Sequence, residues 1–151
     1  MKINTFAVLI SIVVLSCISN RKQSGIREID FTLIAKNNLY GDGNEGLTKQ
    51  NKIITDKSTW EQLITQMNSV NNVSDDFSET EIDFSKYTVI VIIDEIRGSG
   101  GYSLDIDIKG NQDSMLVNVT HVEPEGTSTS EITQPFYIVK VEKNDSPVIF
   151  K

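Results

Sequence analysis

Alternating apolar and polar residues predict most of the secondary structure of this chain. A period of two is typical of a half-buried β-strand. The segments with this alternation, or with a shorter apolar run, are 26–35, 52–56, 102–109, 115–122, 136–143 and 147–150. In the first of them, one face collects the side chains expected in the core, which are those of Ile29, Phe31, Leu33 and Ala35. In 102–109 the inward positions begin at Tyr102.

One further strand candidate is apolar at almost every position. Residues 88–93 read Thr-Val-Ile-Val-Ile-Ile, so they are β-branched throughout and apolar on both faces. A strand that is covered on both sides has this composition. We therefore expect 88–93 at the centre of a sheet.

A single segment has the periodicity of a helix. Its apolar stripe, spaced i, i+3, i+4 and i+7, consists of Trp60, Leu63, Ile64 and Met67. Ser58 and Glu61 fit a capping box at its start, so the predicted helix runs from about Ser58 to Val70. One helix among many strands predicts an α+β, β-rich fold, mainly an antiparallel sheet or sandwich.

Composition narrows the class of protein. The 151 residues suit one domain of ~100–200 residues. A single Cys and a single His exclude a disulfide framework and the Cys-rich zinc sites. The formal net charge of -7 argues against nucleic acid as the main partner, because phosphate binding needs a basic face. We assign no cofactor.

The first 25 residues are typical of an export and anchoring segment. Lys2 precedes an apolar run, Phe6 to Leu15, that is too short to span a bilayer. The only Cys of the chain follows, and Val14-Leu15-Ser16-Cys17 resembles the bacterial lipobox. We therefore expect a lipoprotein signal peptide over 1–16, a lipidated tether over 17–25 and a single β-rich domain over 26–151. The alternative is an ordinary signal peptide followed by an unmodified thiol.

The lipobox resemblance also implies a location. In proteins with this motif the Cys is diacylated and becomes the new N-terminus. Acyl chains on Cys17 would hold the protein in a lipid bilayer, since each buried CH₂ contributes ~0.8 kcal/mol. We expect a bacterial cell-envelope protein, anchored in the outer membrane or the cell membrane, with its domain outside the cytoplasm.

Residues that carry chemistry form no pattern that demands an enzyme. His121 has no serine in a recognisable nucleophile motif, although a hydrolase that uses His121 is one hypothesis. Acidic pairs occur at Asp94-Glu95 and at Asp105 and Asp107. The latter two share a strand face about 7 Å apart and could hold a weak Ca²⁺, but alternation also places such residues on a solvated face. We assign no catalytic and no metal-binding residue, and we expect no enzyme.

The glycine-rich loop Gly98-Ser99-Gly100-Gly101 is a second candidate feature. A phosphate-binding loop stands in front of a helix, whereas this one precedes a strand. It is more typical of a turn with positive φ or of a close backbone approach.

Residues 83–151 resemble the C-terminal domain of the PrcB family, which is named as a protease complex subunit. The resemblance rests on the order of four pieces: Asp83-Phe84-Ser85-Lys86-Tyr87, Ser99–Leu104, Thr133–Val139 and Pro147–Phe150. Phe136-Tyr137, where Pro-Tyr is expected, and Arg97 beside the glycine turn depart from the family. The resemblance implies a domain without catalysis of its own that associates with an exported protease.

A more distant likeness is to chagasin-type protease inhibitors, which present loops at one end of a β-sandwich. The counterparts here would be Gly101-Tyr102 and Pro135-Phe136. The candidate partner-binding residues are therefore Gly98, Gly100, Gly101, Tyr102, Pro135 and Phe136. The alternative is that Tyr102 and Phe136 belong to the core, because each begins an apolar alternating face.

These observations predict a non-enzymatic, membrane-anchored lipoprotein that binds a protein partner, such as an exported protease, as a subunit or modulator. Two alternatives remain at this point. One is an envelope module that binds a small ligand or Ca²⁺, and the other is a domain that resembles a protease inhibitor.

Overall fold

The computed structural model describes residues 25–111, 113–127 and 129–151. The predicted signal peptide, Cys17 and all of the predicted tether except Gly25 lie outside the described residues.

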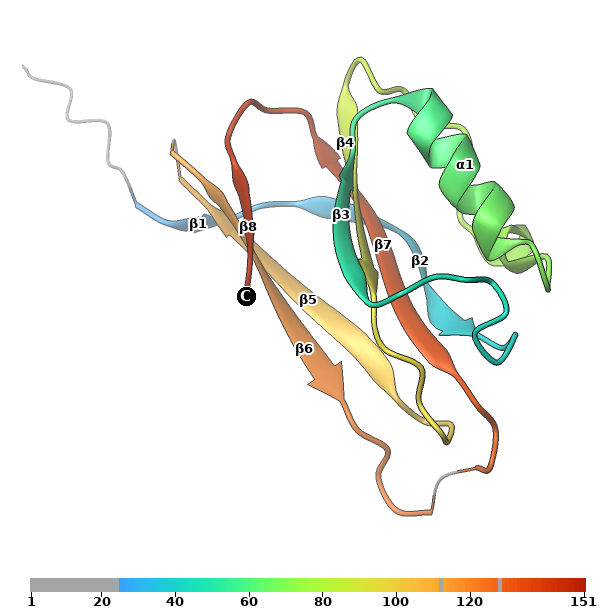
Figure 1. Cartoon of the computed structure of the whole chain (residues 1–151). Coiled ribbons are helices and arrows are strands. Elements are labelled where there is room, and N and C mark those ends of the chain that lie inside the picture. Colours follow the sequence, from blue (N-terminus) through green and yellow to red (C-terminus); the bar gives the residue numbers. More distant parts are fainter. Residues whose placement is uncertain (1–24, 112, 128) are drawn as a thin grey trace, which may run out of the picture.

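Two four-stranded sheets pack face to face, and a helix covers the outer face of the second sheet (Figure 1). In order, the strands of sheet A are β1 (Arg27–Glu28), β5 (Ser103–Gly110), β6 (Met115–Val122) and β8 (Val148–Phe150). Those of sheet B are β2 (Phe31–Leu39), β7 (Gln134–Glu142), β4 (Tyr87–Ile93) and β3 (Gln50–Ile54). All pairings are antiparallel except that of β6 with β8. The predicted α+β, β-rich sandwich is confirmed.

β4 and β7, the central strands of sheet B, contribute to two separate cores. Successive side chains of a strand point to opposite faces. The odd-numbered residues of β4, such as Val89 and Val91, pack under the helix, whereas Ile90 and Ile92 pack between the sheets. All four are buried. The central strand expected at 88–93 is confirmed.

The helix α1 (Lys57–Met67) presents the predicted apolar stripe to sheet B, with Trp60, Leu63 and Met67 buried. The capping box at Ser58 was wrong. Asp56 is the N-cap, and its carboxylate accepts hydrogen bonds from the Thr59 N–H (2.9 Å) and hydroxyl (2.8 Å).

The helix also begins and ends earlier than the predicted bounds of Ser58 and Val70. An acidic N-cap is favoured by the positive end of the helix dipole, so Asp56 prevails over Ser58. At the other end, Val70 is exposed beyond the last turn. A short 3₁₀ helix, η1 (Val73–Asp76), follows in the segment that returns to β4.

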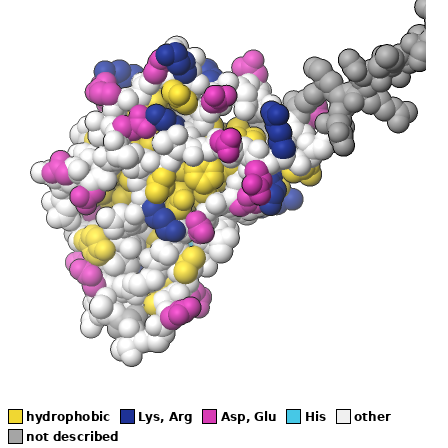
Figure 2. All heavy atoms as spheres, turned by 180° about the vertical axis from the view of Figure 1, so that it is seen from behind, with side chains coloured by type: hydrophobic (Ala, Val, Ile, Leu, Met, Phe, Trp, Pro, Cys, Tyr) yellow, Lys and Arg dark blue, Asp and Glu magenta, His cyan; other side chains and the backbone are white. Residues whose placement is uncertain are grey.

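The single strand expected at 26–35 is two strands, and its predicted core face is only half right: Ala35 is buried and Ile29 packs against the core between the sheets, but Phe31 and Leu33 do not belong to the core. The chain pairs with β5 in sheet A as β1 and then crosses to sheet B as β2. An irregularity in register between Leu33 and Ala35 shifts the alternation, so Ile34 is buried while Phe31 and Leu33 remain partly exposed. Figure 2, seen from behind, shows hydrophobic side chains at the surface in a band across the molecule.

The connections gather at two ends of the sandwich. We call the end with residues 40–49, 94–102 and 123–127 the loop end, and the opposite one, where β1 begins and the chain passes from β7 to β8, the far end (Figure 1). Within the described residues, no helix is both long and apolar enough to cross a membrane.

Candidate functional site

A buried carboxylate, that of Asp94, lies at the centre of the loop end. Asp94 directly follows β4, and its side chain is 2% exposed. Its N–H donates to the carbonyl oxygen of Pro135 (2.8 Å). The side-chain amide of Gln134 donates to the carbonyl oxygens of Asp94 (2.9 Å) and Leu47 (3.0 Å). The end of β4, the start of β7 and the segment before β3 are therefore joined at one point.

Three basic side chains surround this carboxylate. Arg97 reaches Oδ2 through Nη2 (2.7 Å) and Nε (3.2 Å), and Lys49 Nζ lies 3.0 Å from Oδ1. His121 approaches Oδ2 through Nδ1 at 3.2 Å. These residues come from three different connections or strand ends, so the carboxylate acts as a common anchor for them.

The charges fix the ionisation of Asp94. Burial of the carboxyl group favours its neutral form, but hydrogen bonds from Arg97 and Lys49 outweigh this effect and hold the pKa of Asp94 well below its usual range. The same contact raises the pKa of Arg97. Asp94 is therefore ionised at neutral pH and paired with the cationic side chains of Arg97 and Lys49.

Arg97 extends the network to the glycine loop. Its guanidinium lies over the ring of Tyr102, 4.9 Å from the centroid, and its Nη1 pairs with Glu95 at 3.1 Å. Its backbone exchanges two hydrogen bonds with Thr133, at 2.7 and 3.0 Å. The Thr133 hydroxyl donates in turn to the carbonyl oxygen of Ser99 (3.1 Å). The connections on either side of this bridge are thus held together.

The glycines of the loop serve close backbone approach, as the sequence suggested. Gly101 has φ +88°, and a Cβ there would lie 2.7 Å from Cβ of Pro124. The Gly100 N–H donates to the carbonyl oxygen of Thr129 (3.1 Å), and a Cβ at Gly100 would collide with the Thr129 hydroxyl. Gly98 is exposed, with open space around the position of a Cβ.

Two of the predicted partner-binding residues were wrong. Pro135 is buried, and Phe136 is 1% exposed in the core under the helix, where its ring lies 6.2 Å from that of Phe77. Because both side chains are buried, they cannot serve as exposed anchors. Tyr102 is half-buried beneath Arg97. Of the six predicted residues, Gly98 is the one most open to a partner.

Sequence reasoning missed the apolar side chains that are exposed at this end. Ile96 is 48% exposed and Ile132 39% exposed. Both are neighbours of the Arg97–Thr133 bridge, so alternation places them on the same side of it, together with Gly98. Ile96 also packs against Gly43, in the connection that begins at the exposed Tyr40. We call Ile96, Gly98 and Ile132 the loop-end surface.

The cluster has some features of a catalytic dyad. Asp94 holds one nitrogen of His121, whose side chain is 43% exposed. Within the described residues, however, no hydroxyl is hydrogen-bonded to the imidazole, and Lys49 and Arg97 share the carboxylate. The geometry therefore explains how the loops are held better than it explains chemistry at His121.

No candidate metal site is formed by the described residues. Asp105 pairs with Lys36 (3.7 Å), and Asp107 pairs with Lys109 (2.7 Å) and accepts from Asn118 (3.2 Å). The search of the described residues finds no group of three or more potential metal ligands. The Ca²⁺ alternative gains no support from these two carboxylates.

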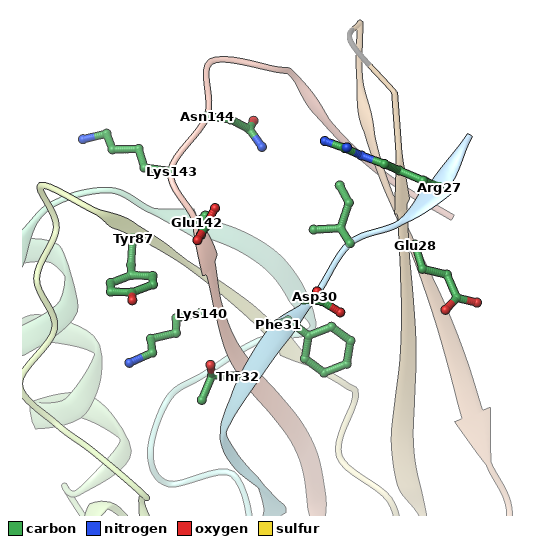
Figure 3. Close-up of a pocket in the computed structure, with 11 residues that line it drawn as sticks. Arg27, Glu28, Asp30, Phe31, Thr32, Tyr87, Lys140, Glu142, Lys143 and Asn144 are labelled. Carbon is green, nitrogen blue, oxygen red and sulfur yellow. The ribbon is translucent and has the colours of Figure 1, made fainter. Parts of the chain in front are cut away.

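A pocket of about 580 Å³ opens at the far end (Figure 3). Tyr87, Lys140 and Thr32 line one side, and Arg27 and Glu28 of β1 approach from the other. Lys140 is already engaged, since its Nζ lies 2.6 Å from Glu79 Oε1 and 4.6 Å from the centroid of the Tyr87 ring. The pocket is lined by scattered charges of both signs that do not converge on one point.

Searches among protein families, curated proteins and solved structures find no match to this chain. The resemblance to the PrcB family stays a prediction from the sequence.

Proposed function

We propose that this protein is a non-enzymatic, lipid-anchored module of the bacterial envelope that binds a protein partner through the loop-end surface. The observation that carries the proposal is that exposed apolar side chains lie on a backbone held in one conformation. Ile96 and Ile132 flank a bridge that Asp94 and Arg97 hold in place. Apolar side chains on loops that are already ordered lose little entropy on binding, so they suit recognition.

The place where the described part of the chain begins supports this arrangement. The described chain starts at the far end, and the loop end lies at the opposite pole of the sandwich (Figure 1). Acylation of Cys17 would anchor the protein through the residues before β1. The loop-end surface would then face away from the membrane, toward a partner such as an exported protease.

Binding is tested by changing the loop-end surface while leaving the core intact. A double variant, Ile96→Asp with Ile132→Asp, should abolish cross-linking to the partner in intact cells, because it puts charge into a desolvated contact. The control is Ile149→Asp, which changes a comparably exposed isoleucine on β8, outside the loop-end surface. Gly98→Arg, in open space, should also weaken the cross-link. If cross-links persist in the double variant, or the native protein forms none, the loop end is not a binding surface.

Anchoring is tested separately at Cys17. Cells fed with labelled palmitate should label the native protein in the membrane fraction, whereas Cys17→Ala should be unlabelled and leave that fraction. An unmodified protein at Cys17 would favour the ordinary signal peptide, without bearing on the loop-end surface.

A further inference from the structure

The outer edge of β3 carries backbone groups that no other strand uses. β3 pairs with β4 on one side only. The hydrogen bond from Asp94 N–H to Pro135 O shows that the even-numbered residues at the end of β4 bond toward β7, so the odd-numbered ones bond toward β3. Lys52 lies opposite Val91 and thus bonds inward, whereas Asn51 and Ile53 turn their N–H and C=O groups outward.

The corresponding edge of β5 is closed. The Asn38 side chain donates to the carbonyl oxygen of Tyr102 (3.3 Å), and Leu104 is fully buried. Farther along, the Ile106 N–H donates to the carboxylate of Asp105 (3.1 Å). Side chains thereby occupy the positions that an added strand would need.

The edge of β2 is closed in a similar way. Ser78 donates through its N–H to the carbonyl oxygen of Ile34 and through its hydroxyl to that of Leu33, both at 2.9 Å. The Asn38 N–H donates to the side chain of Asn37 (2.8 Å).

On β3, by contrast, the outward backbone groups of Asn51 and Ile53 have no hydrogen-bond partner among the described residues. Both residues are exposed at the surface. β3 is therefore an edge strand that is open to an additional chain.

The side chains of β3 indicate what kind of chain would fit. Residues 48–55 contain Lys49 and Lys52 but no acidic residue, in a protein with a net charge of -7. Lys49 is engaged by Asp94, and Lys52 forms no ion pair within the described part of the chain. Ile53 is 39% exposed on the face that looks toward sheet A, since it lies opposite the buried Ile90. A neighbouring strand would place a carboxylate beside Lys52 and an apolar side chain beside Ile53.

We propose that β3 binds an extended segment of a partner protein, with alternating acidic and apolar residues, as a fifth strand of sheet B. This site is distinct from the loop-end surface and does not rest on it. A second copy of the chain fits less well. Antiparallel pairing that uses the outward groups of both Asn51 and Ile53 would place Lys52 opposite the Lys52 of the copy, and like charges in that position repel.

Amide hydrogen exchange of the purified protein tests the open edge first. The amides of Asn51 and Ile53 should exchange rapidly, while that of Lys52 between them should be protected by its bond to β4. Protection of all three amides in the free protein would show that another segment already covers β3, and the proposal would fail.

The ligand chemistry is tested with end-capped peptides of alternating Val and Glu. Such a peptide should protect the Asn51 and Ile53 amides, whereas one of alternating Val and Lys should not. A Val–Glu peptide that is N-methylated at every second residue should also fail, because it cannot complete the ladder. Equal protection by the Lys and Glu peptides, or protection by neither, would overturn the proposed partner chemistry.

Variants at β3 separate strand addition from other binding. Ile53→Pro removes an outward N–H without touching the ladder to β4, and Ile53→Val, which keeps the N–H and the apolar side chain, is its control. The Pro variant should lose peptide binding and keep a protected Lys52 amide, and the Val variant should bind normally. Lys52→Glu should weaken binding of the Glu peptide by roughly fivefold or more. If the proline disturbs the strand, Lys52→Glu still tests the proposal, because it changes only the charge of a side chain.

Two further measurements use the same purified proteins. One asks whether a second copy of the chain occupies β3, and the other asks whether the β3 edge and the loop-end surface bind independently. Sedimentation should show a monomer, and a dimer that Ile53→Pro dissociates would identify a second copy as the occupant and overturn the proposal. The Ile96→Asp, Ile132→Asp variant should bind the Val–Glu peptide like the native protein, so failure of the loop-end proposal leaves this test intact.

Discussion

The two ends of the sandwich arrange their charged side chains in opposite ways. At the loop end, Asp94 is withdrawn from solvent and shared by Arg97, Lys49 and His121. At the far end, charges of both signs line an open pocket, and the ion pair of Lys140 with Glu79 lies at its side. A buried carboxylate with several cationic partners fixes the connections around it, whereas scattered surface pairs stabilise little.

The largest loss of stability is expected when a phenylalanine is replaced by alanine, and the same change can be made near each end of the sandwich. Phe136→Ala should destabilise the protein by about 3–5 kcal/mol, because it leaves a cavity in the core under the helix. Phe31→Ala should cost about 1 kcal/mol, since Phe31 is 36% exposed beside the far-end pocket. Urea denaturation measures both values. Similar values for the two variants would contradict the assignment of Phe136 to the core.

The second comparison removes one charge from each end. Asp94→Ala should cost about 3 kcal/mol, because it removes the carboxylate that Arg97 and Lys49 share at a partly buried site. Lys140→Met should cost no more than about 1 kcal/mol, because the ion pair with Glu79 is only partly buried. Thermal unfolding of the two variants and of the native protein measures both losses of stability. If Lys140→Met were as damaging as Asp94→Ala, the contrast between the ends would be wrong.

A smaller change in stability is expected when the pH is lowered. The pKa of Asp94 is lowered in the folded state from an ordinary value of 3.8, so its contribution to stability is complete above that value. As the pH falls below 3.8, the unfolded chain takes up the proton first, and the contribution declines until the folded carboxyl is also protonated. Denaturation at several pH values should therefore show a weaker acid dependence in Asp94→Asn than in the native protein. Parallel curves would show that Asp94 is not the group responsible.

Much of the fold could be predicted from local patterns. The two-sided apolar run located β4, and strict alternation located β5, because both strands are regular over their length. The same reasoning failed at 26–35, where the chain changes sheets and a bulge reverses the faces. At α1, the sequence predicted Ser58 as the cap, whereas the helix begins one residue earlier and is capped by Asp56.

The loop-end cluster could be predicted only in part. Asp94 and Arg97 are three residues apart, so their ion pair is local in sequence, and Arg97 was singled out beside the glycine turn. Gln134 is separated from Asp94 by 40 positions and from Leu47 by 87, and local patterns carry no information at such distances. Alternation also could not tell that Phe136 faces the helix, because β7 is apolar on both sides.

The position of β7 at the centre of sheet B sets the order in which the chain can fold. β2 is an early strand, yet its only partner in the sheet is β7, with Phe31 opposite Val141. Pairing over such separations closes a large loop and makes folding slow, so sheet B cannot assemble until the last strands have been synthesised. A chain that is exported unfolded, as the predicted signal peptide requires, would gain time from this delay. Truncation before residue 134 should leave β2 and β4 without the strand that joins them.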